Sequence, residues 1–361
     1  MNKIFRYVPV VLAVVFLLSG CTRHTSQQEQ ITDEFASTAS ANATDIETTD
    51  AVPDTAEAAI NRIPERLHGI PLDYFEPAGC PGTLVEFSYD TYESFSYEQK
   101  AIPLKKRALV YLPFGYSERE QYDVFYLMHG GWSNETITLG LPGAESTFKY
   151  VIDHAIENGE IKPMIIVCPT FNNLNENGQD SNDFVMTFML TENYHQELIH
   201  DLIPAVEGEF SAFSKGTSPA ELMAARDHRG FGGFSMGGAA TWRTFQHGMD
   251  YFRYYLPSSV GVSLNDEEIW QGAEGHPPLD NFVFIMTGTD DFAYSYEETR
   301  VGKMRESPYF IESDNEKDGN FAFLVQKDFQ HDAQAAMVYF YNGMRFVWGP
   351  PLPPPPPPPF Y

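Results

Sequence analysis

The sequence predicts an α/β fold in which a mainly parallel central sheet is flanked by helices. Apolar runs of strand length alternate with helix-like segments along most of the chain, and this alternation is typical of a parallel sheet. The strand-like runs are 124–128, 164–167, 282–286 and 321–325, and a helix-like segment follows at 335–347. We expect a few antiparallel strands before them, around residues 83–113. The chain of 361 residues would suit one large domain or two small ones, and its 43% apolar content is ample for a packed core. The composition of the terminal segments favours one domain.

The segment Gly-Phe-Ser-Met-Gly at 233–237 has the spacing of a nucleophile elbow. In such an elbow a serine lies on a tight strand-to-helix turn, and the flanking glycines let neighbouring backbone pass close by. An ordinary glycine-rich turn is the alternative in a chain with 27 glycines. The elbow predicts that Ser235 is the nucleophile of an α/β-hydrolase fold.

The catalytic histidine can be sought by chain order, because α/β-hydrolases place their triad as Ser, then Asp or Glu, then His. Three histidines follow Ser235. His247 lies about three helical turns beyond the elbow and should point away from the site. His276 precedes the best acid. His331, in a loop after the strand-like run 321–325, is therefore the predicted general base.

The orienting acid is predicted at the end of the run 282–286, where a Thr-Gly-Thr turn leads into Asp290 and Asp291. A buried parallel strand carries site residues at its carboxyl end. An acid there would hold the histidine tautomer and stabilise the imidazolium. We expect Asp291 to do so, with Asp290 as a loop or cap residue.

The oxyanion hole is predicted at the end of the strand-like run 124–128, which leads into His129-Gly-Gly-Trp132. Such a loop supplies one backbone N–H, here from Gly131 or Trp132, and the residue after the nucleophile, Met236, supplies the other. His129 is interpreted as a structural loop residue. Aromatic side chains near these positions are candidates for the substrate pocket: Trp132, Phe292 and Tyr294. Trp242 should instead pack under the sheet.

Over about residues 80 to 347, the order of these sequence motifs resembles that of the feruloyl-esterase-like carbohydrate esterases, relatives of esterase D and of the bacterial mycolyltransferases. The matching blocks are 110–113, 115–116, 124–131, 164–167, 197–204, 226–238, 288–291 and 331–332. The resemblance implies Ser235 as nucleophile, Asp291 as orienting acid and His331 as base. The predicted acyl-transfer chemistry needs no cofactor.

The ends of the chain are unlike its middle. Residues 1–21 have a basic start, a short apolar stretch and Leu-Ser-Gly-Cys, which is typical of a lipoprotein signal with lipidation at Cys21. An ordinary signal peptide or an anchor helix is the alternative. Residues 22–75 are interpreted as a disordered acidic Ser/Thr-rich linker, 76–348 as the α/β-hydrolase esterase domain, and 349–361 as a polyproline tail.

Charge and motif spacing exclude several partners. The net charge of −27 disfavours nucleic acid and anionic membrane surfaces, so we expect membrane contact only through the N-terminal lipid, and a monomer. The Asn-rich stretch 173–184 lacks the glutamate that closes a calcium loop, and no His/Cys cluster has zinc spacing, so no metal is expected. Cys168 should be a buried free thiol, although a disulfide with Cys80 stays open.

The predicted function is a serine esterase that hydrolyses carboxylic esters on plant cell-wall polysaccharide, of the feruloyl esterase type that acts on arabinoxylan. It would work at the bacterial cell surface, lipid-anchored on the secreted side. Alternatives of the same fold are an acetyl xylan esterase, a siderophore esterase and an acyltransferase. From another class, a catalytically inactive surface carbohydrate-binding protein would show a broken triad, whereas Ser, Asp and His candidates all occur in order.

Overall fold

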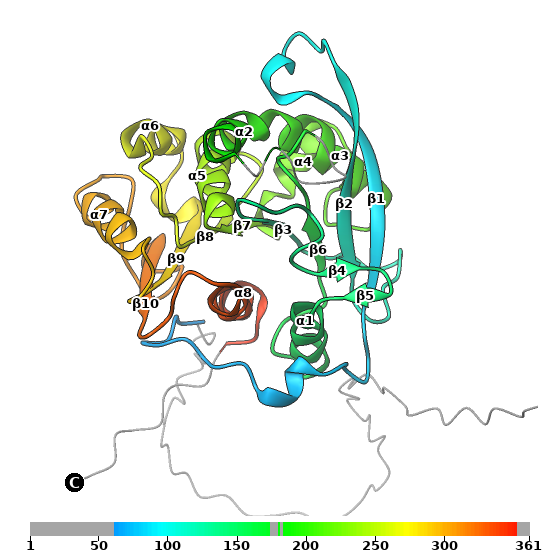
Figure 1. The fold of residues 1–361 in the computed structure, drawn as a ribbon, viewed down its shortest axis with the longest axis horizontal. Helices are drawn as coiled ribbons and strands as arrows, with labels where there is room; N and C mark the ends of the chain where they lie inside the picture. The colour runs from blue at the N-terminus through cyan, green and yellow to red at the C-terminus, as the bar shows by residue number, and fades with distance from the viewer. Residues whose placement is uncertain (1–60, 174–179, 181–182, 352–361) are drawn as a thin grey trace, which may run out of the picture. The chain divides into compact units, whose positions relative to one another are not determined.

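An eight-stranded sheet organises residues 61–173, 180 and 183–351, which the computed structural model describes. Its strand order is β1-β2-β6-β3-β7-β8-β9-β10, and Figure 1 shows it between two layers of helices. The strands are β1 (Thr83–Tyr92), β2 (Pro103–Leu112), β3 (Val124–Met128), β6 (Ile165–Cys168), β7 (Arg229–Phe234), β8 (Tyr254–Ser258), β9 (Phe282–Gly288) and β10 (Phe321–Gln326). A separate small hairpin is formed by β4 (Gly140–Leu141) and β5 (Ala144–Glu145).

The six strands β6, β3, β7, β8, β9 and β10 run parallel to one another, whereas β2 is antiparallel to both β1 and β6. The predicted mainly parallel sheet with antiparallel strands at its start is thus confirmed. The α-helices are α1 (Thr147–Glu157), α2 (Phe184–Glu197), α3 (Ile203–Glu209), α4 (Pro219–Ala224), α5 (Met236–Gly248), α6 (Asp266–Trp270), α7 (Tyr294–Met304) and α8 (Ala333–Trp348). The π-helix η4 (Leu198–Leu202) joins α2 to α3.

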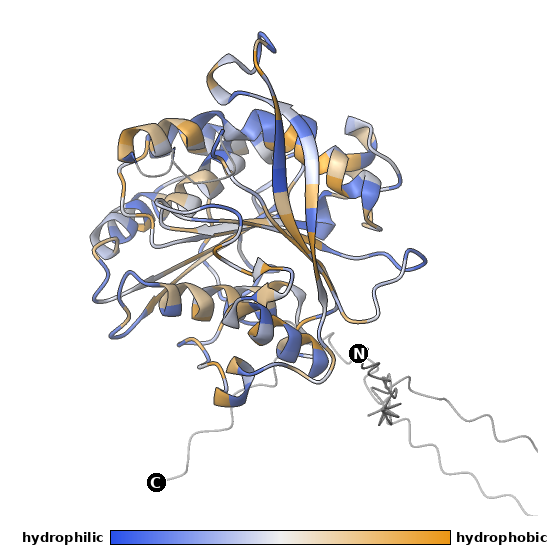
Figure 2. Cartoon of the chain, turned by 45° about the vertical axis from the view of Figure 1, so that its right-hand side comes forward, coloured by the Kyte–Doolittle hydropathy of each residue, from blue (hydrophilic) through white to orange (hydrophobic). Residues whose placement is uncertain are grey.

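Side chains that alternate along the strands divide the core into two clusters. On β2, Val110 packs in the cluster beneath α2, α3 and α5, whereas Leu109 packs in the cluster beneath α1 and α8. Trp242 of α5 is buried in the first cluster, as predicted. Figure 2 shows hydrophobic colour along the strands between the two helical layers. A sheet covered on both faces needs strands that are apolar on both faces, and all seven residues of β9 are buried.

The segment before β1 corrects one predicted boundary. Residues 61–75 fall in the predicted linker, yet Leu67 and Tyr74 are buried in the cluster beneath α1 and α8. The Leu67 N–H donates to the Gln326 side chain, and the short helix η1 (Leu72–Phe75) lies against α1. Residues 61–75 therefore belong to the folded domain, because their apolar side chains are buried against it. The predicted signal segment with Cys21, the linker up to residue 60 and the tail from 352 lie outside the described residues.

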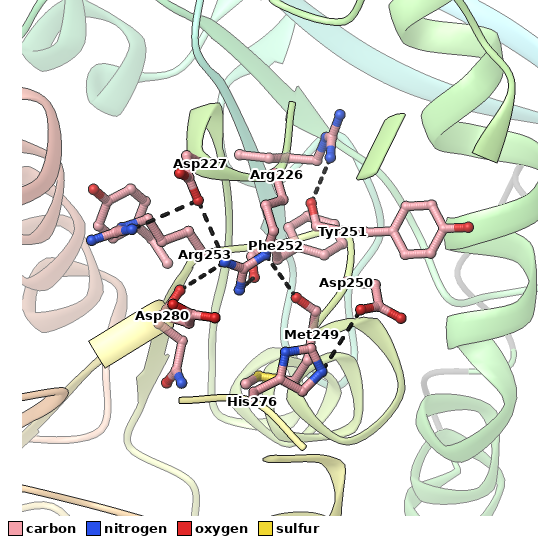
Figure 3. Close-up of polar contacts among 12 residues, drawn as sticks. Arg226, Asp227, Met249, Asp250, Tyr251, Phe252, Arg253, His276 and Asp280 are labelled. Carbon is pink, nitrogen blue, oxygen red and sulfur yellow. Dashed lines mark hydrogen bonds and ion pairs between the residues drawn. The ribbon is translucent and has the colours of Figure 1, made fainter. Parts of the chain in front are cut away.

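The amino ends of the parallel strands are held by Arg226, in the turn η5 (Arg226–His228) before β7. Its guanidinium donates to the carbonyl oxygens of Met249 at 3.0 Å, Asp280 at 2.9 Å and Phe252 at 3.2 Å. Figure 3 shows these residues around the Arg226 side chain, with Arg253 beside them. The half-buried guanidinium of Arg226 thus fixes the starts of β8 and β9, at the edge of the sheet opposite to the carboxyl ends.

The cysteine alternatives are settled by Cys168 at the end of β6. Its thiol is free and buried, and burial raises its pKa. The disulfide with Cys80 that the sequence left open is therefore not formed, and the expected inert thiol is confirmed. No helix among the described residues is both long and apolar enough to cross a bilayer.

Candidate active site

The turn at Ser235 has the geometry that the elbow sequence predicts. Ser235 joins β7 to α5 with φ 58° and ψ −117°, a conformation that is strained for any residue with a side chain. Its N–H donates to the Ser258 carbonyl at 2.9 Å. A Cβ atom on Gly233 would overlap the backbone of Gly237, and one on Gly237 would lie 2.5 Å from the Met128 carbonyl oxygen. Only glycine fits at both positions, so β3 and α5 can close around the serine.

Asp291 and His331 are in direct contact. Asp291 follows β9 and its side chain is 0% exposed, and the His331 Nδ1 lies 2.8 Å and 3.0 Å from its two carboxylate oxygens. The carboxylate also accepts the Ala293 N–H at 2.7 Å. Asp290 is exposed and its carboxylate accepts the Thr289 hydroxyl instead. Of the two neighbouring acids, the structure brings Asp291 to the histidine, as predicted.

The charge on Asp291 is maintained by its hydrogen bonds. Burial raises its pKa, but hydrogen bonds from His331, the Ala293 N–H and Ser259 outweigh burial, and the net pKa lies below its usual value. A carboxylate only accepts, so the His331 Nδ1 must carry the proton that it shares. The lone pair of the neutral ring is then on Nε2, which is the arrangement that a general base needs.

Two aromatic rings flank the His331 imidazole. The Phe234 ring lies 4.5 Å from it and the Phe292 ring 4.3 Å from it, centroid to centroid. Because Phe234 directly precedes Ser235, the first contact places the histidine beside the elbow. No hydrogen bond joins the Ser235 hydroxyl to His331, and such bonds commonly tighten only when substrate binds. The three residues are thus gathered at the carboxyl ends of β7 and β9, with the acid–base pair already formed.

The loop after β3 lies against the elbow. A Cβ atom on Gly130 would be 3.6 Å from the Ser235 Cβ and 3.3 Å from the Phe234 carbonyl oxygen. Met236 is buried at the first position of α5, where the helix leaves backbone N–H groups without intrahelical acceptors. The predicted oxyanion donors, Met236 on one side and the loop with Gly131 on the other, therefore border the nucleophile.

The three aromatic pocket candidates differ in their positions. Trp132 is 66% exposed in the loop after β3, with φ 55°. Phe292 is 62% exposed and contacts the catalytic histidine candidate, and a Cβ atom on Gly261 would overlap its ring. Tyr294 begins α7, and its hydroxyl donates to Glu298 on the same helix at 3.2 Å. The structure thus brings Phe292 to His331 and Trp132 to the loop after β3, but directs the Tyr294 hydroxyl along its own helix.

Sequence reasoning missed Ser259, which follows β8 and is fully buried with φ 50°. Its N–H donates to the Met286 carbonyl at 2.9 Å, its hydroxyl lies 3.3 Å from Thr287 Oγ1, and it supports the Asp291 carboxylate. The signal was the pair of serines at 258–259 after the apolar run 254–256, between the elbow and the acid. A strand end between those of the nucleophile and the acid is where a supporting hydroxyl would lie.

Other candidate sites are separate from these residues. A cavity of about 440 Å³ lies over α2, α5 and α6, and none of the predicted site residues lines it. Its lining residues are Phe188, Glu192, Arg243, Gln246, His247, Asn265 and Glu268. Within the described ranges, no group of three or more His, Cys, Asp or Glu side chains is arranged to hold a metal ion.

The fold, the strained serine turn and the buried acid–histidine pair define a serine hydrolase of the α/β-hydrolase type. The family model "Putative esterase" matches residues 100–281. Endo-1,4-beta-xylanase Y of Acetivibrio thermocellus is 34% identical over an alignment of 282 residues, and the match covers 76% of this chain and 24% of the xylanase. The chain belongs to the esterase family, and it spans about a quarter of that relative's length.

Solved structures agree with this family. A feruloyl esterase module from Clostridium thermocellum, complexed with sinapinate, is 30% identical with a TM-score of 0.67, over 80% of this chain and 95% of the module. A ferulic acid esterase from the fungus Anaeromyces mucronatus is 20% identical with a TM-score of 0.57, over 80% and 98% of the two chains, and shows the shared fold. The resemblance inferred from the sequence is confirmed.

Proposed function

We propose that this chain is a feruloyl esterase that releases hydroxycinnamates, ferulate and its relatives, from plant cell-wall polysaccharide. The observation that carries the chemistry is the buried Asp291–His331 pair beside the strained Ser235 turn. The proposed acyl group is inferred from the solved feruloyl esterase module in complex with sinapinate, 95% of which this chain covers. The proposed polysaccharide is inferred from the xylanase relative.

In the proposed reaction, His331 Nε2 takes the Ser235 proton as the hydroxyl oxygen attacks the ester carbonyl. The oxyanion of the tetrahedral intermediate accepts the N–H groups of Met236 and of Gly131 or Trp132. The C–O bond to the sugar alcohol then breaks, and His331 returns the proton to that alcohol. Water attacks the acyl-enzyme by the same route and frees the acid.

The site's aromatic surroundings support an aromatic acyl group. Phe292 and Trp132 are both largely exposed: Phe292 lies against His331, and Trp132 lies in the loop that carries the proposed oxyanion donor. A phenolic ring can be held by offset stacking or edge contacts with such side chains. The acetyl group of acetylated xylan would leave both faces without a partner, which favours the feruloyl substrate over the acetyl one.

We place the enzyme outside the cell, anchored by a lipid on Cys21 and acting as a monomer. This placement rests on the lipobox-like Leu-Ser-Gly-Cys sequence after a short apolar stretch. Metabolic labelling with a palmitate analogue tests it: the parent chain is expected to take up label and Cys21→Ser is not. Label on the variant would refute lipidation at this cysteine.

The test of function is hydrolysis by the full chain of methyl ferulate, methyl sinapate, 4-nitrophenyl acetate and acetylated xylan. Ser235→Ala is expected to lower kcat by at least about 10⁴-fold, because the covalent step is lost. Ser88→Ala, an exposed serine on the edge strand β1, is the matched control. Activity on acetyl groups alone would make the chain a deacetylase, and retained activity in Ser235→Ala would refute the site.

A further inference from the structure

The imidazole of His129 is buried directly after β3, in the loop that leads to Gly131. The side chain is 3% exposed, and both ring nitrogens have partners at 2.7 Å: Nδ1 the Gly130 carbonyl oxygen, and Nε2 the Thr170 hydroxyl. A carbonyl oxygen only accepts, so Nδ1 must carry the proton and Nε2 must accept from Thr170. Burial lowers the His129 pKa to about 4, so this neutral tautomer persists at neutral pH.

The Gly130 carbonyl and the Gly131 N–H belong to the same peptide unit. The chain has no cis peptide among the described residues, and in a trans peptide the C=O and N–H bonds point in opposite directions from one rigid plane. A donor that holds the carbonyl therefore sets the direction of the N–H. Gly130 packs against Ser235, so this peptide plane lies beside the proposed nucleophile.

We propose that His129 is a positioning residue of the reaction: its Nδ1–H holds the Gly130 carbonyl and thereby directs the Gly131 N–H, rather than that of Trp132, at the oxyanion. The inference rests on the proposed function, because it takes Ser235 as the attacking group. His129 lies outside the triad and transfers no proton in this proposal; its role is to orient the peptide that carries the oxyanion donor.

The His129 ring is itself held from the opposite side. The Thr170 hydroxyl, which donates to Nε2, also accepts the Asn172 N–H at 3.1 Å. The Thr170 carbonyl accepts from Lys106 Nζ at 2.8 Å, and Lys106 forms a fully buried ion pair with Glu197 at 2.7 Å. The oxyanion peptide is thus connected through His129 to an ion pair between β2 and α2, and the imidazole has no freedom to turn.

Glycine at residues 130 and 131 makes this connection necessary. A backbone without side chains has wide conformational freedom, and nothing lies within 4 Å of the position that a Cβ on Gly131 would take. The direction of the Gly131 N–H is therefore not set by steric contacts of that residue. The His129 hydrogen bond supplies the missing restraint, which an oxyanion donor needs because catalysis depends on its preorganised direction.

Two amide variants separate this role from simple packing. The side-chain nitrogen of His129→Asn lies near the place of Nδ1, so it can donate to the Gly130 carbonyl but cannot reach Thr170. The longer side chain of His129→Gln reaches Thr170 but leaves the Gly130 carbonyl without its donor. Each variant loses one of the two ring contacts, so each is the other's control for stability, which thermal melting measures.

We expect kcat on methyl ferulate to be at least about tenfold lower in His129→Gln than in His129→Asn, with KM alike, because losing an oxyanion donor costs about 10²- to 10³-fold. Inhibition by phenylboronic acid, which forms a tetrahedral adduct on Ser235, should weaken in parallel. Equal losses of kcat in the two variants, or losses confined to KM, would overturn the proposal.

A second variant covers the case in which His129→Gln does not fold. Thr170→Val keeps the side-chain volume and removes the donor to Nε2, and it is expected to lower kcat by about fivefold or more at unchanged KM, as a fraction of the cost of losing the donor. Parental kcat in a folded Thr170→Val would overturn the role of the ring. If the parent does not cleave methyl ferulate, the proposed function fails, and the same comparisons on 4-nitrophenyl acetate still test His129.

Discussion

Replacing Asp291 with Asn is the perturbation that most directly tests the acid–base pair. The Ala293 N–H is a buried donor 2.7 Å from Asp291 Oδ1, so the amide oxygen of an asparagine would stay there. The amide nitrogen would then take the place of Oδ2, 3.0 Å from His331 Nδ1, beside the amide oxygen at 2.8 Å. The amide N–H₂ would crowd the Nδ1–H from that place, which favours the tautomer with its proton on Nε2, where the ring cannot accept one from Ser235.

The size of the effect follows from the lost charge. The centres of a carboxylate and an imidazolium in this contact are about 4 Å apart, which at an effective dielectric constant of about 20 is worth roughly 4 kcal/mol. That energy corresponds to about 10³-fold in rate, and the wrong tautomer adds to it. We therefore expect kcat/KM to fall by about 10³- to 10⁴-fold in Asp291→Asn.

The control is the neighbouring acid. Asp290 is exposed and its carboxylate accepts only the Thr289 hydroxyl among the described contacts, so Asp290→Asn should change kcat/KM by less than about threefold. The assay is steady-state hydrolysis of methyl ferulate at pH 7.5, with thermal melting to show that both variants fold. A loss below tenfold in Asp291→Asn, or a larger loss in Asp290→Asn, would refute the reasoning.

Three further predictions concern stability, measured by denaturant unfolding. Gly237→Ala should lower the free energy of unfolding by about 3 kcal/mol or more, because its Cβ would meet the Met128 carbonyl oxygen. Gly131→Ala has open space around its Cβ and should change that free energy by less than about 0.5 kcal/mol. Equal losses in the two variants would contradict the steric account. Arg226→Met should lower the unfolding free energy by about 1–3 kcal/mol, because three hydrogen bonds to carbonyl oxygens are lost, and should leave kcat/KM unchanged. A change in kcat/KM would mean that the amino-end edge of the sheet is coupled to the carboxyl-end edge that carries the site. The unfolded chain protonates His129 near its ordinary pKa and the folded protein only near 4, so the unfolded state binds more protons between these values and the unfolding free energy falls as the pH drops through that window. This residue should contribute about 3 kcal/mol of that loss, and an unchanged pH dependence in His129→Asn would contradict it.

Motif order was enough to predict the nucleophile and the histidine, because both are tied to local chain geometry. An elbow needs glycines at set spacing from the serine, and Gly233 and Gly237 are both sterically required. Strand-length apolar runs placed Asp291 and His331 at carboxyl ends of strands for the same local reason. What could not be read locally was that residues 61–75 belong to the folded domain, since the burial of Leu67 and Tyr74 depends on α1 and α8, which lie far along the chain.

The sequence by itself determined the order of the site residues, the strand pattern that gathers them and the family to which the chain belongs. Only the tertiary structure decided that Asp291, rather than Asp290, meets His331, that Ser259 supports the acid, and that Cys168 stays unpaired. The physical reason is distance along the chain. A glycine turn or a buried strand is specified by neighbours in sequence, whereas the partner of a carboxylate 40 residues away is chosen by packing, burial and the direction of each side chain.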